Sequence, residues 1–268
     1  MNRLGKKIFF ICIVLFAFIS CKEEEENNDT IVPTSTVQLN FDNVVGNEDL
    51  ILDSGTYTNY FEQRFHIAKF NYFISNVALF NERNEMISIY KDSSYFLIKE
   101  KDAFSHNAIL RNIPNGNYTS IQFTIGVDSL KSTAPLNQRT SSLDPGGYAA
   151  DMYWTWNQGY IFMKLECHPY KVRGDTTIGI PYVYHIGGFG GYNTPTINNI
   201  KTVQFAFPNT LKLDGSTTPT IHFKVDALKV LTGSTNIDFE KNPTVMLTNF
   251  SKNVADNYVD MFELTKIE

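Results

Sequence analysis

Alternation of apolar and polar residues with a period of two runs through most of this chain and constrains its fold more than any other feature. Residues 36–45 place Val37, Leu39 and Phe41 between polar neighbours, which is typical of a strand with one buried face. Residues 64–80 are apolar on both faces, as expected of a central strand. Further strand-like segments occupy 93–100, 117–127, 201–207 and 219–231. We therefore expect an all-β fold, a β-sandwich-like single domain with long loops.

Two segments depart from this alternation. Residues 128–151 have no apolar period and contain two prolines and two glycines, so they predict a long loop. Residues 242–264 instead repeat apolar side chains at every fourth position. The repeating residues are Phe250, Val254, Tyr258 and Phe262. This spacing predicts a short C-terminal helix.

The first twenty residues resemble a bacterial secretory signal peptide. A basic start is followed by an apolar run at 8–19, which is shorter than the ~20 residues that a transmembrane helix needs. Residues 18–21 resemble a lipobox, in which Cys21 becomes the lipidated first residue of the mature chain. Because each buried methylene adds ~0.8 kcal/mol to membrane binding, acylation of Cys21 is expected to anchor the protein in a membrane.

Acidic and polar residues at 21–35 predict a disordered tether after the lipid anchor. The acidic run also resembles a signal that exports some Gram-negative lipoproteins to the cell surface, and a solvated spacer is the alternative. We expect three parts: a lipoprotein signal peptide at 1–20, the tether at 21–35 and one β domain at 36–268. The expected location is the bacterial outer membrane, at the cell surface or facing the periplasm.

Charge and cysteine content limit the partners and the covalent chemistry. Loss of residues 1–20 removes three basic residues and no acid, so the net charge of −5 becomes −8. A nucleic-acid partner is not expected, because phosphates require a basic surface. Cys12 leaves with the signal and Cys21 is expected to be acylated. Cys167 therefore has no partner for an intramolecular disulfide.

Both tryptophans of the chain, Trp154 and Trp156, lie two residues apart in the segment 153–170. In a strand they project from the same face, and the apolar face then moves to the odd positions from Ile161 onward. A bulge at residues 157–159 provides the necessary shift of one residue. On physical grounds, paired aromatic side chains on a sandwich strand are more often core than a binding site.

Histidine is the residue type best suited to bind a metal ion in this chain. His185 ends a strand-like segment, and four glycines follow within six residues, so it is either a hydrogen-bonded, half-buried histidine or a ligand. His222 lies on a polar strand face and His66 on the central strand. His168 follows Cys167, and together they offer a weak indication of a soft copper site.

Enzyme motifs are lacking in this sequence. It contains no HExxH, GxSxG, P-loop or CxxC pattern, and we expect a protein that is not an enzyme. A hydrolase that uses Asp128, Asp144 and Glu166 is a third hypothesis without a motif behind it. Turn formation explains Asp128 and Asp144 more simply.

Five segments in a fixed order resemble one known family. They are 70–79, 113–129, 143–145, 152–166 and 184–188. The most specific is the run W-x-W-N-x-G-Y-I-F-x-K-L-E at 154–166 together with H-I-G-G at 185–188. Together they resemble the MbnP-like domain of copper-binding proteins related to MbnP, MopE and CorA, over about residues 36–265.

The resemblance implies a copper ion held by histidine imidazoles and by a tryptophan oxidised to kynurenine. It also implies a di-haem, peroxidase-like partner that carries out the oxidation. Carried onto this chain, the ligands are Trp154 or Trp156 and His185. Family members place a histidine close to the reactive tryptophan, whereas here the neighbours are Tyr, Thr and Asn. A second imidazole then comes from one of three histidines elsewhere in the sequence: His66, His168 or His222.

Two functions remain open from the sequence. The first is a lipid-anchored protein that binds copper ion for its acquisition or handling. The second is a surface lipoprotein that binds a partner without a metal and buries the tryptophan pair as core.

Overall fold

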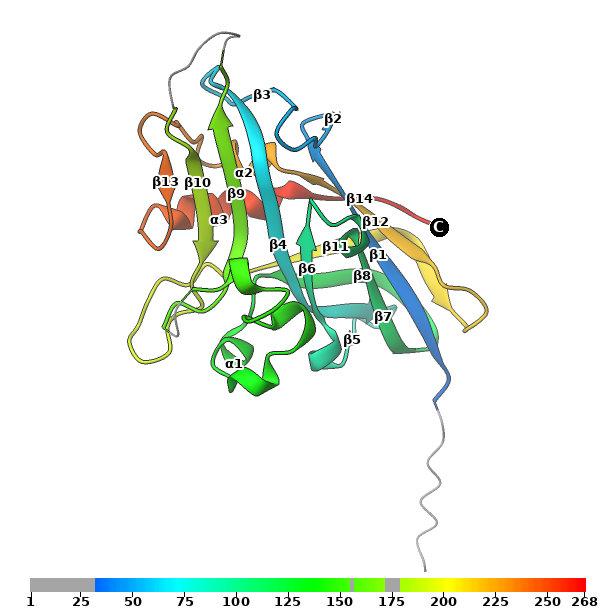
Figure 1. Ribbon diagram of the computed structural model, residues 1–268. Coiled ribbons are helices and arrows are strands. Elements are labelled where there is room, and N and C mark those ends of the chain that lie inside the picture. Colours follow the sequence, from blue (N-terminus) through cyan, green and yellow to red (C-terminus); the bar gives the residue numbers. More distant parts are fainter. Residues whose placement is uncertain (1–31, 155–156, 172–178) are drawn as a thin grey trace, which may run out of the picture. The chain divides into compact units, whose positions relative to one another are not determined.

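The structure, a computed structural model, describes residues 32–154, 157–171 and 179–268 (Figure 1). Cys21, Trp156 and the expected signal peptide lie outside the described residues. Within the described ranges the strands form two sheets. None of the helices in these ranges is long and apolar enough to cross a membrane.

The larger sheet is built around β4, the long strand Arg64–Asn81. Its strand order is β11-β8-β4-β9-β10-β13, and β3, β5 and β6 also pair with β4. These strands are β3 Tyr57–Thr58, β5 Met86–Ser88, β6 Tyr95–Lys99, β8 Gly116–Ile125, β9 Ile161–Pro169, β10 Tyr182–Gly187, β11 Lys201–Leu213 and β13 Thr244–Val245. Figure 1 shows β4, β9 and β10 side by side, in agreement with their pairing.

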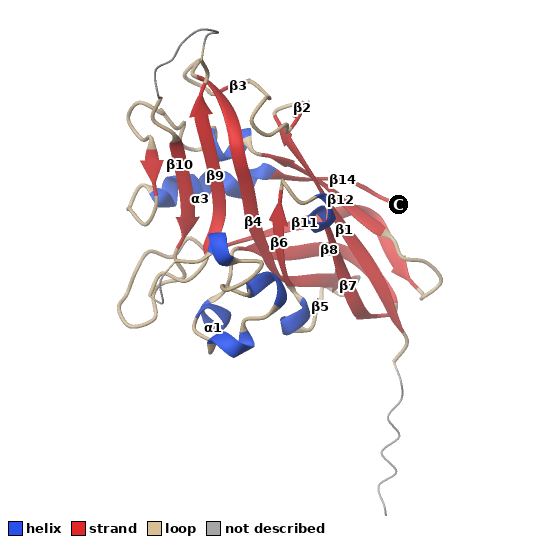
Figure 2. Ribbon diagram, viewed as in Figure 1, coloured by secondary structure: helices blue, strands red, loops and turns tan. Residues whose placement is uncertain are grey.

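The smaller sheet has the order β14-β12-β1-β2, and β7 also pairs with β1. Its strands are β1 Thr34–Val45, β2 Glu48–Asp49, β7 Asn107–Pro114, β12 Thr220–Asp226 and β14 Phe262–Ile267. Strands β1 and β12 run parallel, although they lie far apart in the sequence. Figure 2 shows that helices are few and short beside the strands. They are α1 Ser129–Ser132, α2 Leu228–Leu231 and α3 Ser251–Tyr258.

Aromatic side chains join the two sheets face to face. Phe41 of β1 is fully buried, and its ring stacks on Phe223 of β12 with centroids 5.5 Å apart. The same ring contacts Tyr72 of β4 and Phe123 of β8 edge-on, each at 6.3 Å. Because these partners come from both sheets, the inner faces form one hydrophobic core and the fold is an all-β sandwich.

A second apolar cluster lies on the outer face of the larger sheet. Phe73 of β4 and Phe162 of β9 belong to it, and so do Leu143 and Met152 from the segment 128–152. This segment contains α1 and short 3-10 turns, and it contributes buried side chains to the cluster. The middle of β4 is apolar on both faces because it contributes to both clusters.

The strands expected from sequence alternation are confirmed, with differences at their ends. The expected strand 219–231 stops at Asp226, and Leu228–Leu231 forms α2. The expected C-terminal helix exists but covers only Ser251–Tyr258. Phe262 begins β14 instead of continuing the helix, because its ring packs against Phe41 in the core between the sheets.

Truncation of Phe41 tests the aromatic contact between the sheets. We expect Phe41→Ala to lower the free energy of unfolding by about 3–5 kcal/mol, because it leaves a cavity bordered by both sheets. Urea unfolding followed by circular dichroism measures the change. Phe104→Ala is the control, since Phe104 is 92% exposed and its removal should cost little. Equal effects of the two substitutions would contradict this account of the core.

Candidate functional site

A β-bulge in β4 determines which polar side chains meet on the outer face of the larger sheet. In the pairing with β9, Ile67 lies opposite Cys167 and Lys69 lies opposite Glu166, so Ala68 has no partner on β9. The extra residue reverses the parity of the strand. His66, before the bulge, and Lys69, after it, therefore point to the same face.

From Lys164 onward, the even-numbered residues of β9 are polar and lie on the same outer face as His66 and Lys69 of β4. Its odd residues Met163, Leu165 and Cys167 are fully buried in the core between the sheets. Lys164 and Glu166 therefore point to the outer face. In the register of β10 with β9, His185 lies opposite Lys164, so its imidazole shares that face.

His185 and Glu166 form the closest polar contact of this face. The Nε2 atom of His185 lies 2.8 Å from Oε1 of Glu166, and the two side chains are 14% and 28% exposed. A carboxylate accepts hydrogen bonds, so the imidazole donates through Nε2 and its lone pair then resides on Nδ1. A histidine that is oriented in this way by a carboxylate is the usual arrangement behind a metal ligand.

Lysine residues and one aspartate surround this pair. Lys69 Nζ lies 3.8 Å from Glu166 Oε2 and 3.4 Å from Asp151 Oδ2. Lys99 Nζ lies 3.4 Å from the other oxygen of Asp151, and Lys164 donates to the backbone carbonyl of Asp151. The Lys99, Lys164 and Lys69 charges lower the pKa of Asp151 below its ordinary value, although burial acts in the opposite direction. Two lysines therefore pair with the carboxylate of Asp151, and a third binds its backbone carbonyl.

Burial lowers the pKa of His185 below its ordinary value, and Lys164 and Lys69 add to this effect. The hydrogen bond to Glu166 opposes the shift without reversing it. His185 is therefore neutral at pH 7, which is the form that binds metal ions.

Trp154 precedes β9 and is not part of a strand. Its backbone N–H donates to the carbonyl of Gly159 at 2.9 Å, and Tyr153 pairs with Tyr160 as an isolated bridge. The sequence predicts a strand that carries Trp154 and Trp156 on one face, with a bulge at 157–159. This prediction is wrong at Trp154, because Trp154 lies before β9 and bonds back to Gly159. The position of Trp156 lies outside the described residues.

The indole of Trp154 rests against Gly187. A Cβ atom built on Gly187 would lie 2.8 Å from Cζ3 of Trp154 and 2.3 Å from the carbonyl oxygen of Tyr160. Gly187 and His185 are two positions apart in β10, so they share one face about 7 Å apart. The absence of a side chain at Gly187 thus lets the indole pack against the same face of β10 that carries His185.

Elsewhere on the outer face, two further candidates, His66 of β4 and His168 of β9, lie directly opposite each other. Four residues of β9, or about 13 Å, separate His168 from Lys164, the partner of His185. The histidine pair and His185 are therefore separate places on the same face. Cys167 points into the core, so Cys167 and His168 do not form one site.

His222 is remote from both places, because it lies in β12 of the smaller sheet. Its Nδ1 lies 3.2 Å from Asn40 Oδ1 and its Nε2 lies 3.0 Å from Glu268 Oε1. The expectation that His222 is solvent-exposed is only partly met, because its side chain is 19% exposed. It does not supply the second imidazole for His185.

Asp128, Asp144 and Glu166, the carboxylates of the hydrolase hypothesis, each form local hydrogen bonds. Asp128 caps α1 through the backbone N–H of Lys131 and accepts from Tyr95 at 2.6 Å. Asp144 accepts from the backbone of Gly146 in a turn. Glu166 holds His185. The three carboxylates are thus engaged separately and do not form one reaction centre.

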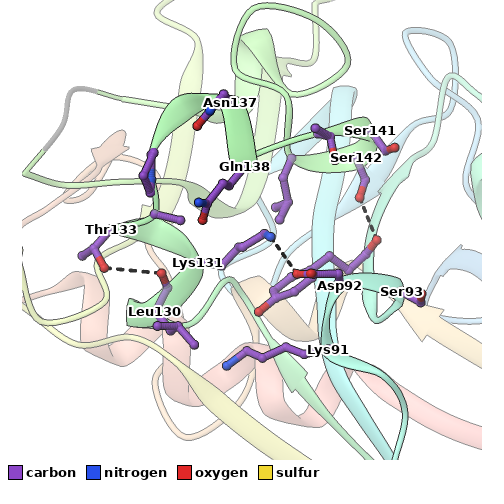
Figure 3. Close-up of a pocket in the computed structure, with 15 residues that line it drawn as sticks. Lys91, Asp92, Ser93, Leu130, Lys131, Thr133, Asn137, Gln138, Ser141 and Ser142 are labelled. Atoms are coloured by element: carbon purple, nitrogen blue, oxygen red, sulfur yellow. Dashed lines mark hydrogen bonds and ion pairs between the residues drawn. The ribbon is translucent and has the colours of Figure 1, made fainter.

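A hollow of about 870 Å³ lies between α1, the turns that follow it and the short turn Lys91–Ser93 (Figure 3). Lys131 Nζ points to Asp92 Oδ1 at 2.8 Å, and Ser142 donates to the carbonyl of Tyr95 at 2.7 Å. Lys91 is paired with Asp128 at 3.5 Å. Both lysines of the hollow are thus matched by carboxylates, and the hollow presents polar groups without an excess of charge.

A complete metal centre is not formed by the described residues. Within residues 32–154, 157–171 and 179–268, no group of three His, Cys, Asp or Glu side chains is arranged to hold an ion. His185 fits one position of a copper site, since it is neutral and oriented by a carboxylate. The described residues around it supply no second imidazole, so the donor set fits copper only in part.

Sequence reasoning named His185 and Trp154 as candidates but did not place Glu166 and Gly187 against them. The sequence suggests Glu166 only as a residue of a possible hydrolase. Its spacing of two residues from Lys164 in β9 nevertheless places both side chains on one face. Gly187 was seen only as one of a glycine cluster. The contact of Gly187 with Trp154 depends on the hydrogen bond between Trp154 and Gly159, which has no signal in the sequence.

Replacement of Glu166 tests the electrostatics of His185. Because a carboxylate favours the imidazolium, Glu166→Gln should lower the pKa of His185 further. The unfolded chain takes up the proton first, near its pKa of about 6.5. The folded protein therefore loses stability as the pH falls from about 6.5 toward the folded-state pKa of His185. Glu166→Gln should lose more stability over this range than the parent, because its folded-state pKa is lower. NMR titration of the imidazole and acid unfolding measure both effects.

Glu263→Gln is the control for this titration, because Glu263 pairs with Lys224 on the smaller sheet. It should leave the pKa of His185 unchanged. A pKa of His185 that rises or stays constant in Glu166→Gln would show that the hydrogen bond does not govern this group.

Substitution of Gly187 tests the contact between Trp154 and β10. We expect Gly187→Ala to reduce stability by at least about 1–3 kcal/mol and to alter the near-ultraviolet circular dichroism of tryptophan, because the methyl group collides with the indole and a backbone oxygen. Gly116→Ala is the matched control, since the nearest atom to its Cβ would lie 3.9 Å away. Unchanged stability and an unchanged spectrum in Gly187→Ala would refute the contact.

Comparisons with known proteins agree with this architecture. MbnP from Methylosinus trichosporium is a solved structure with 17% identity and a TM-score of 0.54, covering 77% of this chain and 80% of that chain. At this identity the likeness shows the fold alone. The comparison with curated proteins finds no match. The sequence model of the MbnP family matches residues 34–247, well over half of the chain. The chain therefore belongs to the MbnP family.

Proposed function

We propose that this protein is a lipid-anchored binding protein that holds a copper ion at the outer face of β9 and β10, for copper acquisition or handling. The observation that supports this most is that Trp154 lies against Gly187, two positions along β10 from His185, in the segments that carry the family resemblance. The proposal assigns a binding function and no catalytic one.

His185 has the chemistry of a first ligand. Its neutral ring donates through Nε2 to Glu166, which leaves Nδ1 for the metal ion. Imidazole is a preferred ligand of copper, and nitrogen and oxygen donors favour the cupric state. The carboxylate behind the ring fixes its orientation and increases the basicity of the donor atom.

The tryptophan segment is the proposed source of the remaining donors. An indole has no lone pair to offer, whereas kynurenine supplies an aniline nitrogen and a carbonyl oxygen. The family resemblance implies that a separate di-haem, peroxidase-like protein makes this change. Trp154 is the proposed residue because its ring lies against Gly187, beside His185. Trp156 is the alternative within the same segment.

Membrane attachment belongs to the same proposal. The apolar run at 8–19 followed by Cys21 supports lipidation of Cys21, and the acidic run after it supports a location on the outer membrane. Lipidation restricts the protein to a surface where metal ions from outside the cell can be captured.

A function without metal is the second candidate, and two observations favour it. Trp154 packs against the apolar cluster that contains Phe162 and Phe189. In the described part of the chain, no three suitable side chains converge on an ion. The tryptophan would then stabilise the outer face of the sheet, and the protein would bind its partner through another surface.

Replacement of His185 distinguishes the two candidates. We expect His185→Gln to weaken copper affinity at least tenfold, or about 1.4 kcal/mol, because it removes the first imidazole. Competition with a chelator of known affinity measures the change. His222→Gln is the matched control, since His222 lies on the other sheet, and it should bind copper like the parent. Equal affinity of His185→Gln and the parent would remove His185 from the copper site, whereas a parent that binds no copper would favour the function without metal.

A further inference from the structure

The outer face of the larger sheet carries a pair of imidazoles that the copper site around His185 does not use. His66 of β4 and His168 of β9 are directly opposite in the register of the two strands. Side chains at opposite positions of antiparallel strands have Cβ atoms about 4.5–5.5 Å apart. Two imidazoles at this separation can reach one metal ion, whose bonds to imidazole nitrogen are about 2.0–2.1 Å long.

The hydrogen bonding of His66 leaves one ring nitrogen free for a ligand. Its Nδ1 lies 2.7 Å from the carbonyl oxygen of Gly55 and 3.4 Å from the hydroxyl of Thr56. A carbonyl oxygen only accepts, so Nδ1 carries the hydrogen atom. In the neutral ring the lone pair is therefore on Nε2. A backbone carbonyl that holds one nitrogen of a histidine in this way is common behind metal ligands.

His168 is exposed, and its side chain has no hydrogen bond within the described part of the chain. Both rings border a hollow of about 450 Å³, which Pro169, Lys171, Gly179 and Pro181 also line. The hollow gives an ion access from solvent and leaves room for further small ligands. The ring of Tyr170 lies 5.6 Å from the imidazole ring of His66, and the guanidinium of Arg64 lies over the Tyr170 ring at 3.5 Å.

We propose that His66 and His168 bind a late first-row transition-metal ion between them, with water or a small anion in the remaining positions. Imidazole donors suit copper, nickel and zinc, and among these copper binds most tightly. Two imidazole ligands without a third protein ligand should give a modest affinity.

A Cu²⁺ titration of the full chain tests the pair separately from the proposed function. The parent for the test is His185→Gln, which removes the imidazole of the other site. In this background we expect one Cu²⁺ ion to bind, with nitrogen couplings from imidazole in the electron paramagnetic resonance spectrum. Adding His168→Gln should weaken this binding at least tenfold, and so should adding His66→Gln.

Several controls keep the outcomes distinct. His168→Gln removes no hydrogen bond within the described residues, so it should leave the fold intact, which thermal unfolding checks. Adding His222→Gln should not change Cu²⁺ affinity. Absence of Cu²⁺ binding in His185→Gln, or binding that His66 and His168 do not affect, would overturn the histidine pair. The proposed copper site at His185 has its own test. It would be contradicted if His185→Gln did not weaken copper binding while His66 and His168 are intact.

Discussion

The pairing of β4 with β9, including the bulge at Ala68, is the constraint on which the candidate sites depend. The register places Lys69 beside Glu166 and His66 opposite His168, while Ile67 and Cys167 point into the core. A shift of one residue would exchange the faces of every side chain, which would bury the charges and expose the core. The large apolar faces of both strands hold this register. The polar groups on the outer face are thus positioned by the hydrophobic core beneath them.

The outer face is divided along the strands into an apolar and a polar part. Near Phe73 and Phe162 it is covered by the segment 128–152, and beyond Lys164 it becomes charged. His185 lies at this boundary: its imidazole is bonded to Glu166 of the polar part, and Gly187, two positions further along β10, contacts Trp154 of the apolar part. A half-buried position of this kind lowers the pKa of the imidazole and keeps it neutral. At this position the imidazole of His185 can act as a metal ligand, or it can stabilise the fold through its hydrogen bond to Glu166.

The sequence predicts the strands well because alternation reports directly which side of a sheet is buried, as in β1 and β12. It predicts His185 at a strand end for the same reason. The turn that contains Trp154 could not be predicted, because it closes on Gly159 and fits against Gly187, a contact between different parts of the chain. The His66–His168 pair depends on a register across about a hundred residues and on one bulge at Ala68, an ordinary alanine in the sequence. Phe262 follows the helical spacing of the C-terminal segment, yet its place in the aromatic core makes it the start of a strand.

The central claim is that the face of β9 and β10 holds a copper ion with help from an oxidised tryptophan. The most direct measurement is a native mass spectrum of the protein purified from its own organism after growth with copper, followed by peptide analysis of 153–164. The account predicts at least one bound copper ion and a kynurenine-sized mass change on the peptide that contains Trp154 and Trp156. A protein without copper and with both tryptophans intact, at saturating copper, would contradict it and leave the tryptophans as part of the core.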